Sequence, residues 1–469
     1  MNSPSSPLSR RQLLGHALHG SMGLGLLSML GAESQALSSS NAAAQAFRTH
    51  PAKARRVILI FLDGGLSHVD SFDYKPRLFS EDSQRIANNV FTGMGQQMTG
   101  TEGVFLKRPD WSFTPCGQSG MWISSLFPHL QSQADSLCMI NSLHTSHANH
   151  FEAVVGMHTG SFNQQRPSIG SWCTYALGSE SQNLPGFVAL ASELPYGGSA
   201  AFGSDFLPGE FQGVRIRPGA EPIKYLRSQR SPGALAAQRE IVAELNEAHF
   251  QERPWHSALH ARMQAWRTAG GMQTAAPEVL DLSKESPETL AAYGVHRPGA
   301  AGTMAWKCLV ARRLIEKGVR FVEVVQRGWD SHGDLRKAHG SRAEEVDQPT
   351  AALLVDLKQR GLLEDTLVVF TTEFGRTPAN ASPGKDGRDH HPHAFSSWLA
   401  GAGVRPGITH GKTDEHGIRI AEGGVHVHDF HATILHLLGI DHTKLTFRHA
   451  GRDYRLTDVE GEPVRDILA

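Results

Sequence analysis

Residues 56–65 read RVILIFLDGG, an unbroken apolar run that ends in an aspartate and two glycines. A continuous apolar run of this length predicts a strand buried on both faces, as in a parallel sheet that helices cover on either side. Further strand-like runs lie at 137–143, 319–325, 366–371 and 395–399, and helical patterns lie at 126–134, 305–317, 343–359 and 429–438. The two kinds of segment alternate, which predicts an α/β fold with a doubly wound, mostly parallel sheet.

The 469-residue chain has the composition of a folded protein, because 40% of its residues are hydrophobic and can fill a core. Its 45 basic and 46 acidic residues nearly cancel, which argues against binding to nucleic acid through bulk charge. Histidine is unusually frequent, at 26 residues. So much imidazole indicates a metal site, acid–base chemistry, or both.

Residues 1–46 predict an export signal rather than part of the fold. The motif SRRQLL at 9–14 precedes a short apolar run at 24–30, and AQA at 44–46 offers a cleavage site. This order is typical of a substrate of the twin-arginine translocation machinery, so we expect a periplasmic or secreted protein. The alternative is a plain amphipathic helix with two chance arginines. The apolar run is too short to span a membrane, and no other segment approaches that length, so we expect no membrane span in the mature protein.

Residues 47–469 predict one α/β domain with an insertion or cap at about 195–298, where Gly, Pro and helical fragments are concentrated. The four cysteines, at 116, 138, 173 and 308, form no C-x-x-C pair, so a structural zinc knuckle is not expected. In an exported protein they either form up to two disulfides or stay as free thiols.

Polar side chains gather where the expected strands end. In chain order they are Asp63, Ser67, His68 and Asp70, then His144, His147 and His150, then Asp330 and His332, then Glu373 and Arg376, and finally Arg388, His390 and His391. Ligands bind at the carboxyl ends of strands in open α/β sheets, so these groups are expected to converge. Carboxylates and imidazoles together hold one or two divalent cations, and this mixture favours zinc or manganese, with iron and calcium as further candidates.

Several long motifs also carry a resemblance to a known family. They are VILIFLDGGLSHVDSFDYKP (57–76), NHFEAVVGMHTG (149–160), GWDSHGD (328–334), VVFTTEFGRTP (368–378), GRDHHPHAFSSWLAGAGVRPG (387–407) and GRDYRLTDVEGEPVRDIL (451–468). They resemble the exported twin-arginine proteins known as domain of unknown function 1501, a family placed near the alkaline phosphatase and sulfatase superfamily. The resemblance implies a sheet of that type and dependence on metal, and it leaves the substrate open.

The resemblance implies metal ligands together with two departures from the superfamily pattern. Asp63 matches the first metal-binding aspartate, whereas Gly64 stands where the second is expected and Phe374 stands where a later ligand is expected. With the strand-end groups, the candidate metal ligands are Asp63, His68, Asp70, His150, Asp330, His332, Glu373, His390 and His391.

The superfamily's nucleophile position falls on His150, which carries no hydroxyl, and no Cys-x-Pro-x-Arg occurs, so a formylglycine sulfatase is not expected. Three chemistries stay open. His150 attacks and forms a phosphohistidine, His150 binds a metal whose water ligand attacks, or Ser67 supplies the hydroxyl. The second is preferred because it needs no unusual nucleophile. Arg376 or Arg388 is expected to clamp the anionic ester.

Two functions follow as hypotheses. The first is an exported metal-dependent hydrolase of a phosphate or sulfate ester, such as a sulfated or phosphorylated saccharide. The second is a non-catalytic protein on the same fold that binds carbohydrate or assembles with envelope partners. The carboxylate–histidine groups favour the first function, and the departures at Gly64 and Phe374 favour the second. A nucleic acid partner is not expected.

Overall fold

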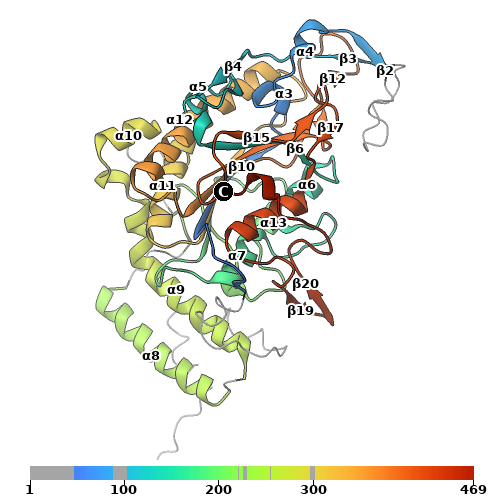
Figure 1. Cartoon of the computed structure of the whole chain (residues 1–469). Coiled ribbons are helices and arrows are strands. Elements are labelled where there is room, and N and C mark those ends of the chain that lie inside the picture. The colour runs from blue at the N-terminus through green and yellow to red at the C-terminus, as the bar shows by residue number, and fades with distance from the viewer. Residues whose placement is uncertain are drawn as a thin grey trace, which may run out of the picture.

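A computed structural model of the chain describes residues 47–87, 103–219, 221–224, 226, 230–253, 255–295 and 301–469. The expected export signal at 1–46 lies outside these residues. A nine-stranded sheet forms the centre (Figure 1), in the order β15-β6-β14-β10-β1-β9-β7-β8 with β18 beside β6. Its strands are β1 (Arg56–Asp63), β6 (Leu137–His144), β7 (Phe187–Leu190), β8 (Val214–Ile216), β9 (Phe321–Arg327), β10 (Thr366–Thr371), β14 (Phe395–Ala400), β15 (Ile408–His410) and β18 (Val425–His426).

The apolar strand β1 lies in the middle of this sheet, between β9 and β10, and is parallel to both. Most other pairs are also parallel, whereas β14 runs antiparallel between β10 and β6. The predicted α/β class with a mostly parallel sheet is therefore confirmed. Because β1, β9 and β10 point the same way, the segments that follow them meet at one edge of the sheet.

Helices cover both faces of the sheet, as a doubly wound fold requires (Figure 1). Buried residues of α5 (Pro128–Gln131), α9 (Ser257–Leu280), α10 (Pro287–Tyr293), α11 (Met304–Glu316) and α12 (Leu335–Gln359) share one core. Buried residues of α6 (His150–Thr159), α7 (Ile169–Leu177) and α13 (Val427–Leu437) share the other. The remaining helices are α3 (His68–Ser71), α4 (Pro76–Ser80) and α8 (Pro232–Gln251).

Strand β1 contributes to both cores because successive side chains of a strand point to opposite faces. Ile58, Ile60 and Leu62 belong to the core beneath α11 and α12. Val57, Leu59 and Phe61 belong to the core beneath α6 and α13. Burying each such side chain contributes ~1.5–3 kcal/mol, which explains why the run is apolar throughout.

Short strands form small sheets around the centre. They are β2 (Arg85–Ala87), β3 (Gly103–Leu106), β4 (Phe113–Cys116), β5 (Met121–Ser124), β11 (Gly375–Arg376), β12 (Ala379–Asn380), β13 (His390–His391), β16 (Lys412–Thr413), β17 (Ile420–Glu422), β19 (Phe447–His449) and β20 (Arg452–Tyr454). The antiparallel pair of β11 and β13 matters most for function, because it places Arg376 opposite His390.

Some boundaries differ from the sequence-based expectation. Helix α12 begins at Leu335 rather than at 343, because its first two turns bury only Leu335 and the polar His339 and so carry little apolar periodicity. The stretch 126–134 forms only the single turn α5, which starts at Pro128. Strand β9 starts two residues later than expected, at Phe321.

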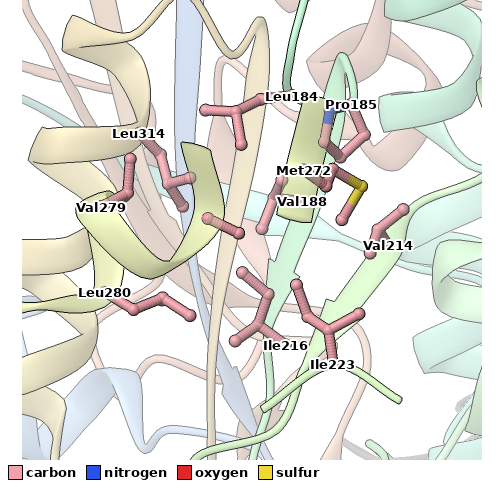
Figure 2. A pocket seen from close by; sticks show the side chains of 11 residues that line it. Leu184, Pro185, Val188, Val214, Ile216, Ile223, Met272, Val279, Leu280 and Leu314 are labelled. Carbon is pink, nitrogen blue, oxygen red and sulfur yellow. The ribbon is translucent and has the colours of Figure 1, made fainter. Parts of the chain in front are cut away.

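The region expected as an insertion or cap contributes to the body of the protein. Its strand β8 extends the central sheet, and Met272, Ala276 and Val279 of α9 belong to the core under α11. Figure 2 shows the apolar pocket where α9 packs against β7, β8 and Leu314 of α11. The division of the chain at about 195 and 298 stays a prediction.

None of the helices that the structure describes combines the length and the apolar character needed to cross a membrane. All four cysteines are buried free thiols, so of the two states expected for them the structure shows the reduced one.

Candidate metal centre

The candidate site lies where the segments after β9 and β10 meet the start of α6. His150 is the first residue of α6, and Asn149 caps that helix by accepting the N–H of Phe151. Asp330 and His332 follow β9, Glu373 follows β10, and His390 lies in β13. The predicted convergence of these five side chains at the carboxyl edge of the sheet is therefore what the structure shows.

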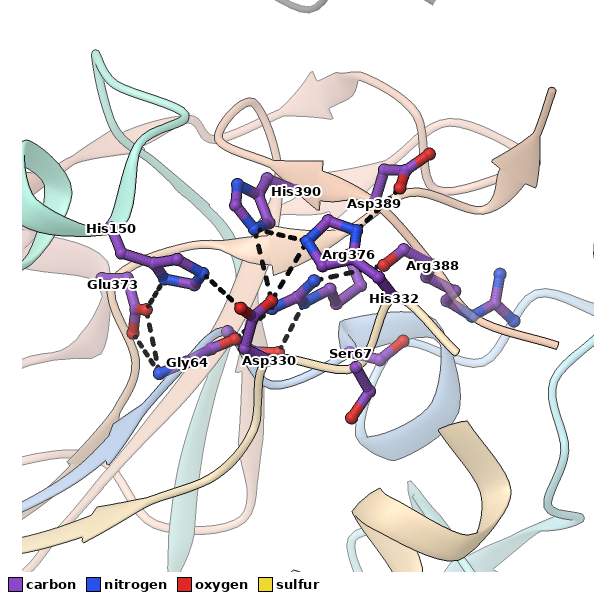
Figure 3. A network of polar contacts seen from close by, with 12 residues as sticks. Gly64, Ser67, His150, Asp330, His332, Glu373, Arg376, Arg388, Asp389 and His390 are labelled. Atoms are coloured by element: carbon purple, nitrogen blue, oxygen red, sulfur yellow. Dashed lines mark hydrogen bonds and ion pairs between the residues drawn. The ribbon is translucent and has the colours of Figure 1, made fainter. Parts of the chain in front are cut away.

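Four of these side chains lie close together, as Figure 3 shows, and we call His150, Asp330, His332 and His390 the central cluster. Within it, His150, Asp330 and His390 offer three donor atoms that all lie within 4.8 Å of one another. The Asp330 carboxylate lies 3.3 Å from His150 Nε2, 3.2 Å from His332 Nε2 and 3.4 Å from His390 Nε2. His332 Nε2 and His390 Nε2 are 2.9 Å apart. With metal–nitrogen bonds of ~2.0–2.1 Å, tetrahedral donors lie ~3.3–3.4 Å from one another, so the spacing suits one shared ion.

Each imidazole of the central cluster is held from behind through Nδ1. His150 Nδ1 lies 2.6 Å from Glu373 Oε1, His332 Nδ1 lies 2.8 Å from Asp389 Oδ1, and His390 Nδ1 lies 2.7 Å from the carbonyl oxygen of Ala148. All three partners are acceptors, so Nδ1 carries a proton in each ring, and Nε2 is the nitrogen that faces Asp330. Acceptors behind the ring are typical of histidines that bind metal.

The inner nitrogens need a cation between them. His332 Nε2 and His390 Nε2 face each other at 2.9 Å, and the buried His150 Nε2 has the Asp330 carboxylate as its neighbour at 3.3 Å. Lone pairs at such distances repel unless a proton or a metal ion lies between donor atoms. One divalent ion held by His150, His390 and Asp330 would fill this role, and imidazole with carboxylate is a donor set that zinc and manganese accept.

Charge around Asp330 keeps it ionised. Burial alone would raise the pKa of its carboxyl, but hydrogen bonds from His150 and His390 and the charge of Arg376 hold that pKa well below its usual range. Burial disfavours a charged His150, yet hydrogen bonds to Asp330 and Glu373 outweigh it and raise the pKa of the ring to about 9. Burial lowers the pKa of His390, with Arg376 and His150 adding to the effect. Asp330 is therefore ionised near neutral pH and, in the absence of a metal, pairs with a protonated His150.

The backbone directly after β1 holds the Glu373 side chain in place. Its carboxylate accepts the Gly64 N–H at 2.9 and 3.1 Å and the Thr372 hydroxyl at 3.0 Å. Gly64 has a φ of 124°, and a Cβ there would lie 2.5 Å from the Asp330 nitrogen. Only glycine fits this approach, so the departure noted at Gly64 has a packing reason.

The two arginines expected to clamp a substrate are held by the protein. Arg376 is fully buried and binds Asp330 at 2.6 Å, the carbonyl oxygens of Gly65 and Arg388, and that of Gly64. Arg388 is also fully buried, and every nitrogen of its guanidinium has a protein partner. Arg376 therefore lies beside the central cluster as a fixed charge, whereas Arg388 points away from it (Figure 3).

Four further candidates form a separate network next to α3. The Ser67 hydroxyl donates to Asp70 at 2.5 Å, and Asp70 pairs with Arg388 at 2.6 Å. His68 Nε2 bonds the Gly417 carbonyl oxygen and His391 Nε2 bonds that of Ile418. The positive charges of Arg388 and Lys107 outweigh burial and lower the pKa of Asp70. The structure thus separates Ser67, His68, Asp70 and His391 from the central cluster.

Asp63, the last residue of β1, lies beside Arg327 at the end of the neighbouring strand β9. Its carboxylate accepts the Tyr196 N–H at 3.1 Å and the Arg327 Nε–H at 2.9 Å. Burial and the nearby charge of Glu373 raise its pKa to about 7, although Tyr196 and Arg327 oppose the shift. Asp63 therefore faces Tyr196 and Arg327 rather than the imidazoles.

Sequence reasoning missed two side chains of this site, Asp389 and Tyr196, and named Phe374 only as a lost ligand position. Asp389 stands behind His332, and its place in the GRDHHPH loop directly before His390 was a usable signal. Tyr196 stacks on His150 at 4.3 Å, and Phe374 contacts the rings of His150 and His390 at 4.8 and 4.7 Å. Nothing in the sequence near Tyr196 indicates that it reaches a site 46 residues earlier in the chain.

A second group of histidines, here called the C-terminal cluster, comprises His426, His428 and Glu460. His428 Nδ1 lies 2.8 Å from Glu460, and its Nε2 lies 2.8 Å from the Gly160 carbonyl oxygen. His426 Nδ1 accepts the His428 N–H at 3.3 Å, and its Nε2 lies 3.1 Å from the Ser146 hydroxyl. His426 thus caps α13, and both ring nitrogens of His428 already face an acceptor.

The chain matches one protein family and is distantly similar to several solved structures. The model of a family described as "Protein of unknown function (DUF1501)" matches residues 54–468, and no curated protein matches the chain. Among solved structures, the PsFucS1 sulfatase from Pseudoalteromonas sp. aligns at 13% identity and TM-score 0.38, over 92% of this chain and 76% of that one. The lipoteichoic acid synthase LtaP from Listeria monocytogenes aligns at 11% and 0.36, over 92% and 81%. The alkaline phosphatase from the Antarctic bacterium TAB5 aligns at 11% and 0.33, over 83% and 99%.

Proposed function

The chain belongs to the DUF1501 family, and we propose that it is a metal-dependent hydrolase of a phosphate or sulfate ester. One observation carries this proposal. Three imidazoles, each fixed through Nδ1 by an acceptor, direct their Nε2 atoms at one carboxylate. A structural core has no need of this arrangement, because buried imidazoles are satisfied by ordinary hydrogen bonds.

The residues suit an ion that activates water. When bound, a divalent metal lowers the pKa of a water ligand toward ~7 and polarises the ester. His150, His390 and Asp330 would hold the ion and leave one position for water. Glu373 would orient His150, Asp389 would orient the neighbouring His332, and Arg376 would keep Asp330 charged. The Ser67 hydroxyl is buried against Asp70, which supports water rather than a serine as the nucleophile.

Elemental analysis of protein purified without chelator tests the proposal, together with turnover of 4-nitrophenyl phosphate and 4-nitrocatechol sulfate. We expect about one equivalent of zinc or manganese per chain, lost in Asp330→Asn and His390→Gln along with more than about a hundredfold of any turnover. Glu460→Gln is the matched control and should keep both. Absence of metal after incubation with zinc and manganese would overturn the proposal and leave carbohydrate binding or envelope assembly as the function.

We also propose export by the twin-arginine route to the periplasm or the medium. The support is the order of the arginine pair, the apolar run and the cleavage motif in residues 1–46. The double variant Arg10→Lys, Arg11→Lys should retain the protein in the cytoplasm, as measured by cell fractionation. Unchanged export of this variant would contradict the proposed route.

A further inference from the structure

A row of cationic side chains continues from the central cluster along the carboxyl ends of β9, β7 and β8. The ring of Tyr196 stacks on His150 at 4.3 Å and 15°. The guanidinium of Arg327 lies over the Tyr196 ring at 4.7 Å. A ring has two faces, so Tyr196 is held between His150 and Arg327 and sets their separation at two stacking layers. Asp63 locks this stack by accepting from both Tyr196 and Arg327.

Arg327 presents its charge at the surface next to the candidate metal site. Its side chain is 35% exposed, and it also contacts Glu193 at 3.2 Å, a residue whose side chain is 73% exposed. An exposed pair of this kind contributes little and rearranges easily. Asp63 holds the Nε of Arg327 at 2.9 Å, so it is the exposed end of the guanidinium that is open to an anionic ligand, in contrast to the fully buried Arg376 and Arg388.

Two more cations lie directly beyond Arg327. Arg215 donates from Nε to the carbonyl oxygen of Ala191 at 2.9 Å and from Nη2 to that of Ser192 at 2.7 Å. Lys307 donates to the carbonyl oxygen of Val325 at 2.7 Å. Strands β7 and β9 pair with Leu190 opposite Val324, so the carbonyls of Ala191 and Val325 lie on adjacent strands, ~4.8 Å apart.

The charges of Arg215 and Lys307 are only partly balanced by the described residues, because Glu193 and Glu345 act on them from beyond ion-pair distance. Neither side chain has a carboxylate within ion-pair distance in the part of the chain that the structure describes, and Lys307 is only 4% exposed. The nearby Glu193 contacts Arg327, and Glu345 pairs with Arg342 at 3.0 Å. A buried ammonium with one neutral acceptor is costly, and an anion beside it would recover that cost.

We infer that Arg327, Arg215 and Lys307 form a subsite for a second anionic group of the substrate. The substrate is then a saccharide that carries a sulfate or phosphate group in addition to the ester held at the central cluster. The Tyr196 ring, stacked between His150 and Arg327, separates the position of the ester from the subsite. One or two sugar rings span that separation. The inference rests on the proposed function for the first position, but its charge argument stands on β7, β8 and β9 alone.

Calorimetric titration with chondroitin-type disaccharides that carry one or two sulfate groups tests the subsite. Wild-type protein should bind the disulfated compound about tenfold more tightly than the monosulfated one, as one added charge-assisted contact predicts. Arg215→Gln should reduce this ratio to below about twofold and leave binding of the monosulfated compound unchanged. Lys307→Met is the second variant, since an apolar side chain of similar length suits a buried position.

Arg448→Gln on β19 is the control, because Arg448 is 68% exposed and pairs only with Asp453. Equal affinity of the wild type for the two disaccharides would overturn the subsite, as would a tenfold ratio that survives both Arg215→Gln and Lys307→Met. A tenfold ratio in a protein without metal or turnover would retain the subsite and overturn the proposed hydrolase. Turnover without the ratio would do the reverse.

Discussion

The central cluster and the C-terminal cluster both bring imidazoles to a carboxylate, but they differ in what the ring nitrogens have left to offer. In the central cluster three Nδ1 atoms are tied to acceptors behind the rings, and three Nε2 atoms face Asp330. In the C-terminal cluster His426 uses both nitrogens on local partners, and only His428 lies between two acceptors.

This difference teaches that proximity of histidines is a weak sign of a metal site. The sign is a surplus of lone pairs directed at one point, because such a surplus needs a shared cation. Burial and the neighbouring rings of His428 and His144 lower the pKa of His426 to about 4, so that ring is neutral and serves as a helix cap. The contrast between the central cluster and the C-terminal cluster has four measurable consequences.

The largest effect is expected from exchanging the carboxylates of the two clusters for amides. Asp330→Asn removes the only charged ligand of the central cluster, so bound metal should fall below about a tenth of an equivalent. Glu460→Gln in the C-terminal cluster should leave the metal content at the wild-type value. Elemental analysis after gel filtration measures both. Equal loss of metal in the two variants would mean that the C-terminal cluster also binds an ion.

A smaller effect is expected from replacing the carboxylates that accept from Nδ1 of His150 and His332. Glu373→Gln and Asp389→Asn each weaken the acceptor that holds Nδ1, so metal affinity should fall ~10–100-fold without being abolished. Competition with a chromogenic chelator measures this affinity. The exposed Asp453→Asn on β20 is the matched control. Wild-type affinity in both variants would show that the acceptors do not orient the ligands.

The two clusters should respond to pH in opposite directions in metal-free protein. The folded-state pKa of His150 is raised to about 9, so its stabilisation is complete below the unfolded value of ~6.5 and is lost as pH rises through about 9. The pKa of His426 is lowered to about 4, so the folded state loses stability as pH falls from ~6.5 to about 4. Urea unfolding across pH 3–10 measures both windows.

Each pH range in which stability changes should lose its effect when the histidine responsible for it is replaced. His150→Gln should flatten the dependence of the free energy of unfolding between pH ~6.5 and 9 and leave the acidic window intact. His426→Gln should do the opposite. If both variants keep the wild-type profile, the shifts belong to other groups. Added zinc should also suppress the alkaline window, because metal replaces the proton on His150.

The smallest effect is expected at the caps of α6 and α13. Asn149→Ala and Asp429→Ala each remove a capping interaction and should lower the free energy of unfolding by about 1 kcal/mol. Only Asn149→Ala should also weaken metal binding, because α6 begins at His150. Thermal unfolding and chelator competition measure the two effects. A change in metal affinity in Asp429→Ala would contradict the separation of the clusters.

Much of the fold was predictable because β1 is apolar on both faces. A strand of this kind can lie only inside a sheet covered twice, and the alternation of strands and helices then fixes the class. The antiparallel direction of β14 and the early start of α12 were not predictable. Pairing direction depends on distant partners, and a solvent-exposed first turn leaves no apolar pattern.

The candidate site was predictable as a set of strand ends but not as a geometry. His150, Asp330, His332, Glu373 and His390 come together as expected, and their roles as ligands stay predictions. Five other candidates follow strand ends in the sequence yet lie in another network. They are Ser67, His68, Asp70, Arg388 and His391. The difference arises from which carbonyl or carboxylate each side chain meets. Some of those partners, such as Arg388 for Asp70 and Gly417 for His68, lie 318 and 349 residues away in the sequence.

By itself the sequence determined the family, the α/β class and the edge of the sheet at which chemistry is concentrated, because these depend on local patterns and on strand direction. Tertiary structure alone decided which imidazoles keep a free lone pair and which are used as caps. It also decided that Arg376 and Arg388 are buried while Arg327 is exposed. Hydrogen-bond partners are set by distances of a few ångströms across the fold, which no local pattern encodes.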